Sequence, residues 1–154
     1  IGFFEPPAAN AADDYQDGPR GLKYLVTNEG YGAKPVRGQK IKTSYTLYLN
    51  DWPESGGKKI DSSKGLLGDK PFEFNVGVSM VVKGWDLALL DMKEGESRRL
   101  IIPSDLGYGD QGAGGSIGGI PGSATLYFQV TLTELGKFPT NNAEQTEWLE
   151  KNPL

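Results

Sequence analysis

Hydrophobic and polar residues alternate along several short stretches of this chain, and this pattern predicts β-strands. The clearest stretch is 41–49, in which one face of the expected strand carries Ile41, Thr43, Tyr45, Leu47 and Leu49. Alternating or short apolar runs predict four more strands, near 22–26, 71–76, 98–103 and 125–135. Turn residues such as Asn, Pro and Gly separate these segments, so we expect about five short strands joined by loops.

One segment, 81–95, has a helical period. Four apolar residues recur at helical spacing: Trp85, Ala88, Leu89 and Met92. Gly95 is well placed to end this helix. A helix this short is not stable alone in water, so it must pack against a sheet. The sequence therefore predicts an α+β fold, in which an antiparallel sheet carries one short α-helix on its apolar face.

The two ends of the chain differ from the segment between them in composition and in the pattern of hydrophobic residues. Residues 1–20 are rich in proline and lack any period, so we expect an irregular arm, followed by one domain over 21–136. In the extension 137–154, Asn142 and Gln145 have the spacing of a capping box, and Asn152-Pro153 predicts the end of a short helix. Trp148 and Leu149 on that helix either fold back on the domain or dock to a partner.

Composition excludes several classes of chemistry. The chain contains no cysteine and no histidine, which excludes disulfides, thiolate nucleophiles, Ser-His-Asp hydrolysis and His-ligated zinc. A formal net charge of −4 argues against a nucleic-acid binder. No apolar run approaches the roughly 18 residues of a membrane span. We therefore expect no metal, no cofactor, no nucleic acid and no membrane span.

The stretch 106–122 is rich in glycine, and Gly107 to Gly112 match the pattern G-x-G-x-x-G. A dinucleotide fingerprint needs a strand leading directly into the glycines and a helix opening from them. Here Pro103 to Leu106 separate the expected strand from the glycines, and more glycine and a proline follow. This pattern alone indicates a flexible connection between strands rather than a phosphate-binding loop.

Three segments carry further motifs: 58–77 (KKIDSSKGLLGDKPFEFNVG), 81–112 (VVKGWDLALLDMKEGESRRLIIPSDLGYGDQG) and 119–132 (GIPGSATLYFQVTL). Together they resemble the FKBP family of peptidyl-prolyl cis-trans isomerases. The resemblance runs from about residue 22 to 136. It joins D-S-S, K-P-F-x-F, V-x-G-W, the Tyr-Gly pair after I-I-P-S-D-L, and I-P followed by A-T-L-x-F.

The resemblance implies a bent antiparallel sheet wrapped over the short helix, with an aromatic cavity between them. Trp85 would form the cavity floor, and the catalytic set would be Asp61, Trp85, Tyr108 and Phe128. The substrate-binding set would be Tyr45, Ile60, Phe72, Val81, Val82 and Ile120, with the two isoleucines at the rim. The Tyr108 hydroxyl and the Val82 backbone N–H would contact ligand carbonyls, and the glycine-rich stretch would form a flap.

Such a site suits the residues that are present. Rotation about an X-Pro bond makes and breaks no stable covalent bond, and its barrier of roughly 18–20 kcal/mol comes from amide resonance. A dry aromatic pocket favours the twisted, less dipolar amide, so neither histidine nor cysteine is required. The implied partners are proline-containing polypeptides and macrolides of the FK506 or rapamycin type.

Some features depart from the resemblance or have a simpler interpretation. Ile60 replaces a common aromatic, and Gly119-Ile120-Pro121-Gly122 replaces I-I-P-P, which loosens the lid and predicts weaker activity. Trp85 and Phe128 could be ordinary core residues, and Asp61 could simply form a turn. Tyr108 has the least structural purpose among its glycines and is the strongest functional candidate.

The leading hypothesis is a prolyl isomerase that helps proteins fold, and the alternative is an FKBP domain serving as a scaffold subunit through its terminal arms. A nucleotide-dependent enzyme rests only on the glycines. The start at Ile1 suggests processing, and segments 63–77 and 98–112 resemble the plant and algal plastid branch. That branch predicts the thylakoid lumen and photosynthetic membrane complexes as partners, with cytoplasm or periplasm as alternatives.

Overall fold

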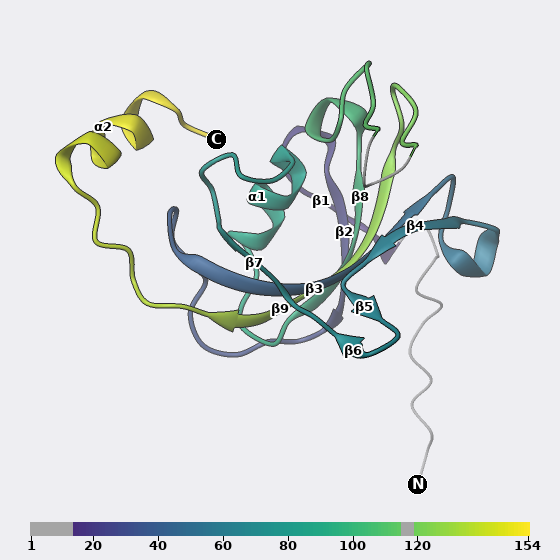
Figure 1. Cartoon of the computed structure of the whole chain (residues 1–154), viewed down its shortest axis with the longest axis horizontal. Helices are drawn as coiled ribbons and strands as arrows, with labels where there is room; N and C mark the ends of the chain where they lie inside the picture. Colours follow the sequence, from purple (N-terminus) through teal and green to yellow (C-terminus); the bar gives the residue numbers. More distant parts are fainter. Residues whose placement is uncertain (1–13, 115–118) are drawn as a thin grey trace, which may run out of the picture.

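Strands β3 and β9 form the centre of an antiparallel sheet in the computed structural model, which describes residues 14–114 and 119–154. The sheet has seven strands in the order β1-β2-β8-β9-β3-β4, with β7 also pairing with β3 (Figure 1). Their bounds are β1 Gln16–Asp17, β2 Lys23–Asn28, β3 Lys40–Leu49, β4 Lys58–Ser62, β7 Phe72–Asn75, β8 Ser97–Ile102 and β9 Leu126–Leu135. All five strands expected from the sequence are present.

Several shorter elements were not expected. A two-stranded hairpin joins β5 (Lys64–Gly65) to β6 (Gly68–Asp69). Single 3-10 turns are η2 (Pro19–Gly21), η3 (Pro53–Ser55) and η4 (Ser104–Leu106). Strands β1, β4, β5 and β6 are short, and the sequence pattern did not separate them from loops.

The outer edge of β3 is divided between two partners. β7 pairs with its first half, from Lys40 to Thr43, whereas β4 pairs with its second half, from Thr46 to Leu49. Tyr45 lies at the division, where its backbone carbonyl accepts a hydrogen bond from the Ser63 N–H at 2.9 Å. Strands β4 and β7 therefore diverge beside Tyr45, and the inward side chain of Tyr45 borders the space between these two strands.

The α-helix α1 (Lys83–Leu89) packs against the inner face of the curved sheet (Figure 1). The hydrophobic core between them includes Leu47, Leu89, Leu100, Ile102 and Leu126, each at most 2 % exposed. Gly84 on α1 allows close approach to the sheet, because a Cβ there would lie 2.6 Å from Ile102 Cγ2.

The expectation of a helix that runs to Gly95 is wrong. α1 ends at Leu89. Arg98 on β8 donates to the carbonyl of Asp91 at 3.2 Å and to its carboxylate at 3.0 Å, which stabilises a turn there instead. Met92 still enters the core after this turn, and Gly95 (φ 82°) packs against the ring of Tyr31.

The C-terminal extension forms the helix α2 (Ala143–Lys151), as its sequence predicts. The Asn142 side chain accepts from the Gln145 N–H at 2.8 Å, and the Gln145 side chain accepts from the Asn142 N–H at 2.9 Å. The helix ends at the Asn152 cap, directly before Pro153. Figure 1 shows α2 standing apart from the sheet, with the C-terminus returning toward the turn before α1.

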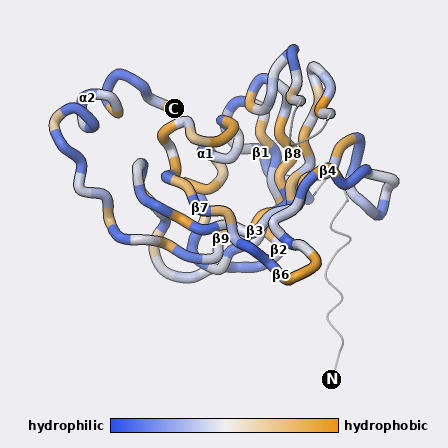
Figure 2. The backbone as a smooth tube through the Cα atoms, viewed as in Figure 1, coloured by the Kyte–Doolittle hydropathy of each residue, from blue (hydrophilic) through white to orange (hydrophobic). Residues whose placement is uncertain are grey.

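Hydrophobic segments gather where the sheet faces α1, with one clear exception at the tip of the β5–β6 hairpin (Figure 2). Leu66 and Leu67 at that tip are fully exposed. Within residues 14–114 and 119–154, no helix is long and apolar enough to cross a membrane.

Candidate functional site

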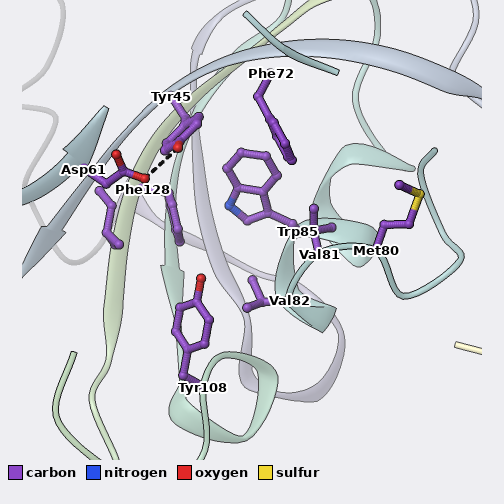
Figure 3. A pocket seen from close by; sticks show the side chains of 10 residues that line it. Tyr45, Asp61, Phe72, Met80, Val81, Val82, Trp85, Tyr108 and Phe128 are labelled. Atoms are coloured by element: carbon purple, nitrogen blue, oxygen red, sulfur yellow. Dashed lines mark hydrogen bonds between the residues drawn. The ribbon is translucent and has the colours of Figure 1, made fainter. Parts of the chain in front are cut away.

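A cavity of about 300 Å³ opens between α1 and the sheet (Figure 3). Five elements, β3, β4, β7, α1 and β9, and the loops beside them supply its walls, which are mainly aromatic and aliphatic. The lining residues are Tyr45, Leu47, Asp61, Phe72, Met80, Val81, Val82, Trp85, Tyr108 and Phe128. Eight of the ten residues predicted from the sequence therefore converge on one concavity.

Trp85, in the first turn of α1, forms the floor of this cavity. Its ring centroid lies 5.2 Å from the rings of both Tyr45 and Phe128, and both contacts are edge-on. Phe72 completes the aromatic wall, with its ring centroid 6.3 Å from that of Trp85. Edge-to-face packing of this kind fixes each ring against its neighbours, so the cavity shape does not depend on one flexible side chain.

The period of two in β3 and β9 explains how these rings come together. Tyr45 and Leu47 are two residues apart on β3 and share its inner face, while Leu47 is paired with Phe128 on β9. Phe72 is paired with Thr43 on the other side of β3. Three neighbouring strands thus place their inward side chains directly above Trp85.

Tyr45 and Asp61 form the central polar contact of the cavity. The Tyr45 hydroxyl donates to Asp61 Oδ2 at 2.6 Å, and the Ser62 N–H donates to Asp61 Oδ1 at 2.9 Å (Figure 3). Burial raises the pKa of Tyr45, and its hydrogen bond to Asp61 and the charge of that carboxylate raise it further. Tyr45 therefore remains a neutral phenol, and both oxygens of Asp61 are held in place.

Tyr108 lies on the opposite wall, in the loop that follows η4. Its ring points into the cavity and its hydroxyl is directed toward Phe128 and Asp61 (Figure 3). Burial raises the pKa of Tyr108, and the charge of Asp61 adds to this effect. The loop is held by the Gly109 N–H, which donates to the Ser104 carbonyl at 2.8 Å, so a glycine-rich segment still positions its tyrosine.

Val82 places a backbone donor at the cavity wall. It is the residue that caps α1, and its carbonyl accepts from the Trp85 N–H at 3.0 Å. Its own N–H has no hydrogen-bond acceptor among the residues that the structure describes. Together with the Tyr108 hydroxyl, it gives the cavity two donors suited to carbonyl groups of a bound molecule.

Two of the residues predicted at the rim, Ile60 and Ile120, do not line the cavity outlined by residues 14–114 and 119–154. The pairing of β3 with β4 shifts between Leu47 and Tyr48, which leaves Ile60 as an extra residue outside the register. Ile120 is 3 % exposed and belongs to the core, where it exchanges two backbone hydrogen bonds of 2.9 Å with Ala113. Residues 115–118 of the predicted flap lie outside the described residues.

Leu47 and Met80 line the cavity although the sequence analysis did not select them. The signal for Leu47 was available, because it is on the same face of β3 as Tyr45. Met80 carries no such signal. It follows Ser79, whose φ of 65° belongs to a turn that only the folded chain defines.

The chemistry of this cavity favours binding and distortion over proton transfer. No cluster of three or more potential metal ligands occurs within the described part of the chain. Among the described residues that line the cavity, the one carboxylate is that of Asp61, which accepts from Tyr45 and Ser62. The arrangement suits a neutral, apolar ring that enters over Trp85 and carries carbonyl groups toward the two donors.

Comparisons with known proteins agree with this geometry. The family model for the FKBP-type peptidyl-prolyl cis-trans isomerases matches residues 31–133. An FK506-binding protein 2B from Rhizopus delemar is 43 % identical over 87 % of this chain, which spans 60 % of that relative's length. An FK506-binding protein from Neisseria meningitidis serogroup B is 44 % identical over 75 % of this chain and 96 % of its own length.

Solved structures show the same fold. The crystal structure of AtFKBP13 superposes with a TM-score of 0.68 at 35 % identity, and the match covers 79 % of this chain and 98 % of that one. The match therefore includes nearly all of the crystallised AtFKBP13 chain.

Proposed function

Because this chain belongs to the FKBP-type peptidyl-prolyl cis-trans isomerase family, we propose that its cavity binds the proline ring of an X-Pro segment and accelerates rotation about the preceding peptide bond. The observation that carries the proposal is the convergence of Tyr45, Trp85 and Phe128 in one cavity with two donors, the Val82 N–H and the Tyr108 hydroxyl, that have no acceptor among the described residues. Uncatalysed X-Pro exchange takes tens to hundreds of seconds, so modest catalysis has a large effect on folding chains.

The aromatic walls supply the main catalytic effect. A planar amide is strongly dipolar because the nitrogen lone pair is delocalised onto the carbonyl oxygen. At the transition state the bond is twisted, the lone pair is localised on nitrogen, and the carbonyl resembles a ketone. A cavity from which the rings exclude water disfavours the planar state more than the twisted one, and each 1.4 kcal/mol of this difference gives about tenfold in rate.

The polar groups position the substrate in this mechanism. The Val82 N–H and the Tyr108 hydroxyl donate to substrate carbonyls and hold the chain on either side of the rotating bond. The Tyr45–Asp61 pair keeps the Tyr45 ring upright beside the proline and places a fixed negative charge near the amide carbon. No proton is transferred in any step.

The cellular role follows from this activity. The substrates would be exposed proline-containing segments of folding polypeptides, and macrolides of the FK506 or rapamycin type would compete for the same cavity. The acidic net charge of −4 and the plastid-like segments 63–77 and 98–112 support a place in the thylakoid lumen. Detection of this chain in fractionated chloroplasts tests this location. Co-purification from the lumen fraction tests association with photosynthetic membrane complexes.

A protease-coupled assay on short proline peptides tests the enzymatic proposal. We expect the wild-type protein to accelerate cis-to-trans exchange and Phe128→Ala to reduce kcat/KM by at least about tenfold, because the wall above Trp85 is removed. Asp61→Ala should reduce it as well. If the folded wild type gives no acceleration and neither variant changes the rate, the proposed function is wrong.

A further inference from the structure

A second groove lies beside the catalytic cavity, between α2 and the turn that follows β7. Its volume is about 320 Å³, and its apolar walls are Val78, Met80, Trp148 and Leu149. Met80 also lines the catalytic cavity, so one side chain separates the two hollows. Figure 3 shows Met80 on the side of the cavity away from Asp61 and Tyr45.

The α2 side of this groove is fixed by one arginine. The Arg37 guanidinium donates to the carbonyl of Leu149 at 3.3 Å and to that of Asn152 at 2.6 Å. Its Nε donates to the Gly77 carbonyl at 2.8 Å. Arg37 therefore joins the C-terminal carbonyls of α2 to the turn that carries Met80, and its positive charge is also favourable at this end of a helix.

The turn on the other side is equally fixed. The buried carboxylate of Asp86, on α1, accepts from the Gly77 N–H at 2.7 Å and from the Ser79 N–H at 3.0 Å. Because Asp86 follows Trp85 directly, the same helix positions the cavity floor and the turn leading to Met80. Both walls of the groove are thus anchored to the elements that build the catalytic site.

Two large apolar side chains of this groove are open to solvent. Met80 is 58 % exposed and Trp148 is 40 % exposed. Isolated exposed apolar residues need no explanation, but Met80 borders both hollows and Trp148 faces it across the second one. No charged side chain is among the described residues that line the groove, which disfavours a charged occupant.

On the basis of the proposed function, we propose that this groove is a specificity subsite for an uncharged, apolar side chain of the same polypeptide whose proline occupies the catalytic cavity. The continuity through Met80 identifies the occupant. An extended chain advances about 3.3 Å per residue, so a segment that leaves the cavity over Met80 reaches Trp148 within a few residues of the proline. The C-terminal helix thereby belongs to the substrate-binding surface of this protein.

A peptide series tests this subsite. A short peptide with one residue on each side of Xaa-Pro fills only the cavity, whereas longer peptides carry a single leucine at each flanking position in turn. We expect one leucine position to raise the wild-type kcat/KM by about tenfold over the alanine peptide. Trp148→Ala should abolish this gain and leave the rate for the short peptide unchanged, and Arg37→Gln should reduce the gain by releasing α2.

Glu144→Ala is the matched control, because this residue lies on α2 but does not line the groove. It should keep the leucine-dependent gain. As a second measurement, the indole N–H signal of Trp148, one of three tryptophans in the chain, should shift when the favoured leucine peptide binds, and the alanine peptide should not shift it.

The outcomes separate the two proposals. If the wild type does not accelerate the short peptide, the proposed function fails and the subsite fails with it. If the short peptide is turned over normally but no leucine position gives a gain that depends on Trp148, the subsite alone is wrong. An equal loss for short and long peptides in Trp148→Ala would also contradict it.

Discussion

The hydroxyl of Tyr45 on β3 donates a 2.6 Å hydrogen bond to the carboxylate of Asp61 on β4, beside the point where β4 and β7 part. The bond joins the centre of β3 to the shifted edge strand β4, and it orients a ring that packs edge-on against Trp85. One contact thus links β4 to the aromatic wall of the cavity and supplies the central polar group of the lining.

Tyr45→Phe tests this contact. Loss of a hydrogen bond to a charged group costs about 1.5–3 kcal/mol when the charge is left without a partner, so the free energy of unfolding should fall. Asp61 keeps the Ser62 N–H, which places the expected loss near the lower limit. We also expect kcat/KM to fall by several-fold as the ring loosens, which urea denaturation and a peptide isomerisation assay measure.

Asp61→Asn and Asp61→Ala provide the matched pair for this prediction. The asparagine variant retains an oxygen that accepts from Tyr45, whereas the alanine variant leaves the buried hydroxyl without an acceptor. Asparagine should therefore cost less stability than alanine. Equal stability of both variants and the wild type would show that the bond contributes nothing to the fold.

Tyr108→Phe separates the hydroxyl from the ring. The hydroxyl has no hydrogen-bond partner within the described residues, so its removal should leave Tm unchanged. A bond to a substrate carbonyl is worth about 0.5–1.5 kcal/mol, which predicts a fall in kcat/KM and in macrolide affinity of roughly threefold to tenfold. Tyr108→Ala should lose more, because the ring wall is also removed. Unchanged catalysis in the phenylalanine variant would argue that Tyr108 contributes only its ring.

The two cavity tyrosines predict a specific pH dependence. Burial raises the pKa of Tyr45 and of Tyr108 above the ordinary value near 10, so both hydroxyls keep their protons below that pH. The isomerisation rate should therefore stay level between about pH 8 and 10. A fall in kcat/KM below pH 10 in folded protein, as judged by circular dichroism, would contradict these assignments.

The raised pKa values of Tyr45 and Tyr108 also predict how the free energy of unfolding changes with pH. Around and above pH 10 the folded protein holds the phenolic protons more tightly than the unfolded chain does, so the unfolding free energy should fall as pH rises through that range. Tyr45→Phe removes one of the groups responsible and should flatten this slope. Denaturation series at several pH values, compared between the wild type and Tyr45→Phe, measure the difference.

Gly84→Ala tests the close packing of α1 on β8. A methyl group there would lie 2.6 Å from Ile102 Cγ2, so α1 must move. Overpacking costs about 1–3 kcal/mol and is partly offset by the better helix propensity of alanine, about 1 kcal/mol. We expect a lower Tm and a lower kcat/KM, because Trp85 moves with the helix.

Gly114→Ala is the control for this change, since no atom of the described residues lies within 4 Å of a Cβ at Gly114. Its effect on stability should stay within about 0.5 kcal/mol. If both variants melt together with the wild type, α1 is not packed closely enough for Gly84 to be required.

Local patterns in the sequence predicted the features that local interactions determine. The alternation over 41–49 placed Tyr45 and Leu47 on one face, and the capping box at Asn142 and Gln145 set the start of α2. In both cases the deciding contacts lie within a few residues of each other along the chain. The aromatic set around Trp85 came from family motifs, and the structure brings those rings together.

Local sequence patterns could not predict features that depend on contacts between residues far apart in the sequence. α1 ends at Leu89, shortly before the Asp91 that Arg98 binds, and Ile60 stands where β4 shifts its register against β3. Arg37 contacts Leu149 and Asn152, which lie more than a hundred positions away in the sequence. These contacts hold α2 against the domain. No period or motif near these residues encodes such contacts.

The most direct test of the account is the rate of cis-trans exchange in a proline peptide, measured by NMR exchange spectroscopy with catalytic amounts of the protein. We predict that exchange accelerates in proportion to the protein added, that one equivalent of FK506 abolishes the acceleration, and that the indole N–H signal of Trp85 shifts as the macrolide binds. An exchange rate that folded protein leaves at its uncatalysed value, with a Trp85 signal indifferent to the macrolide, would contradict the account.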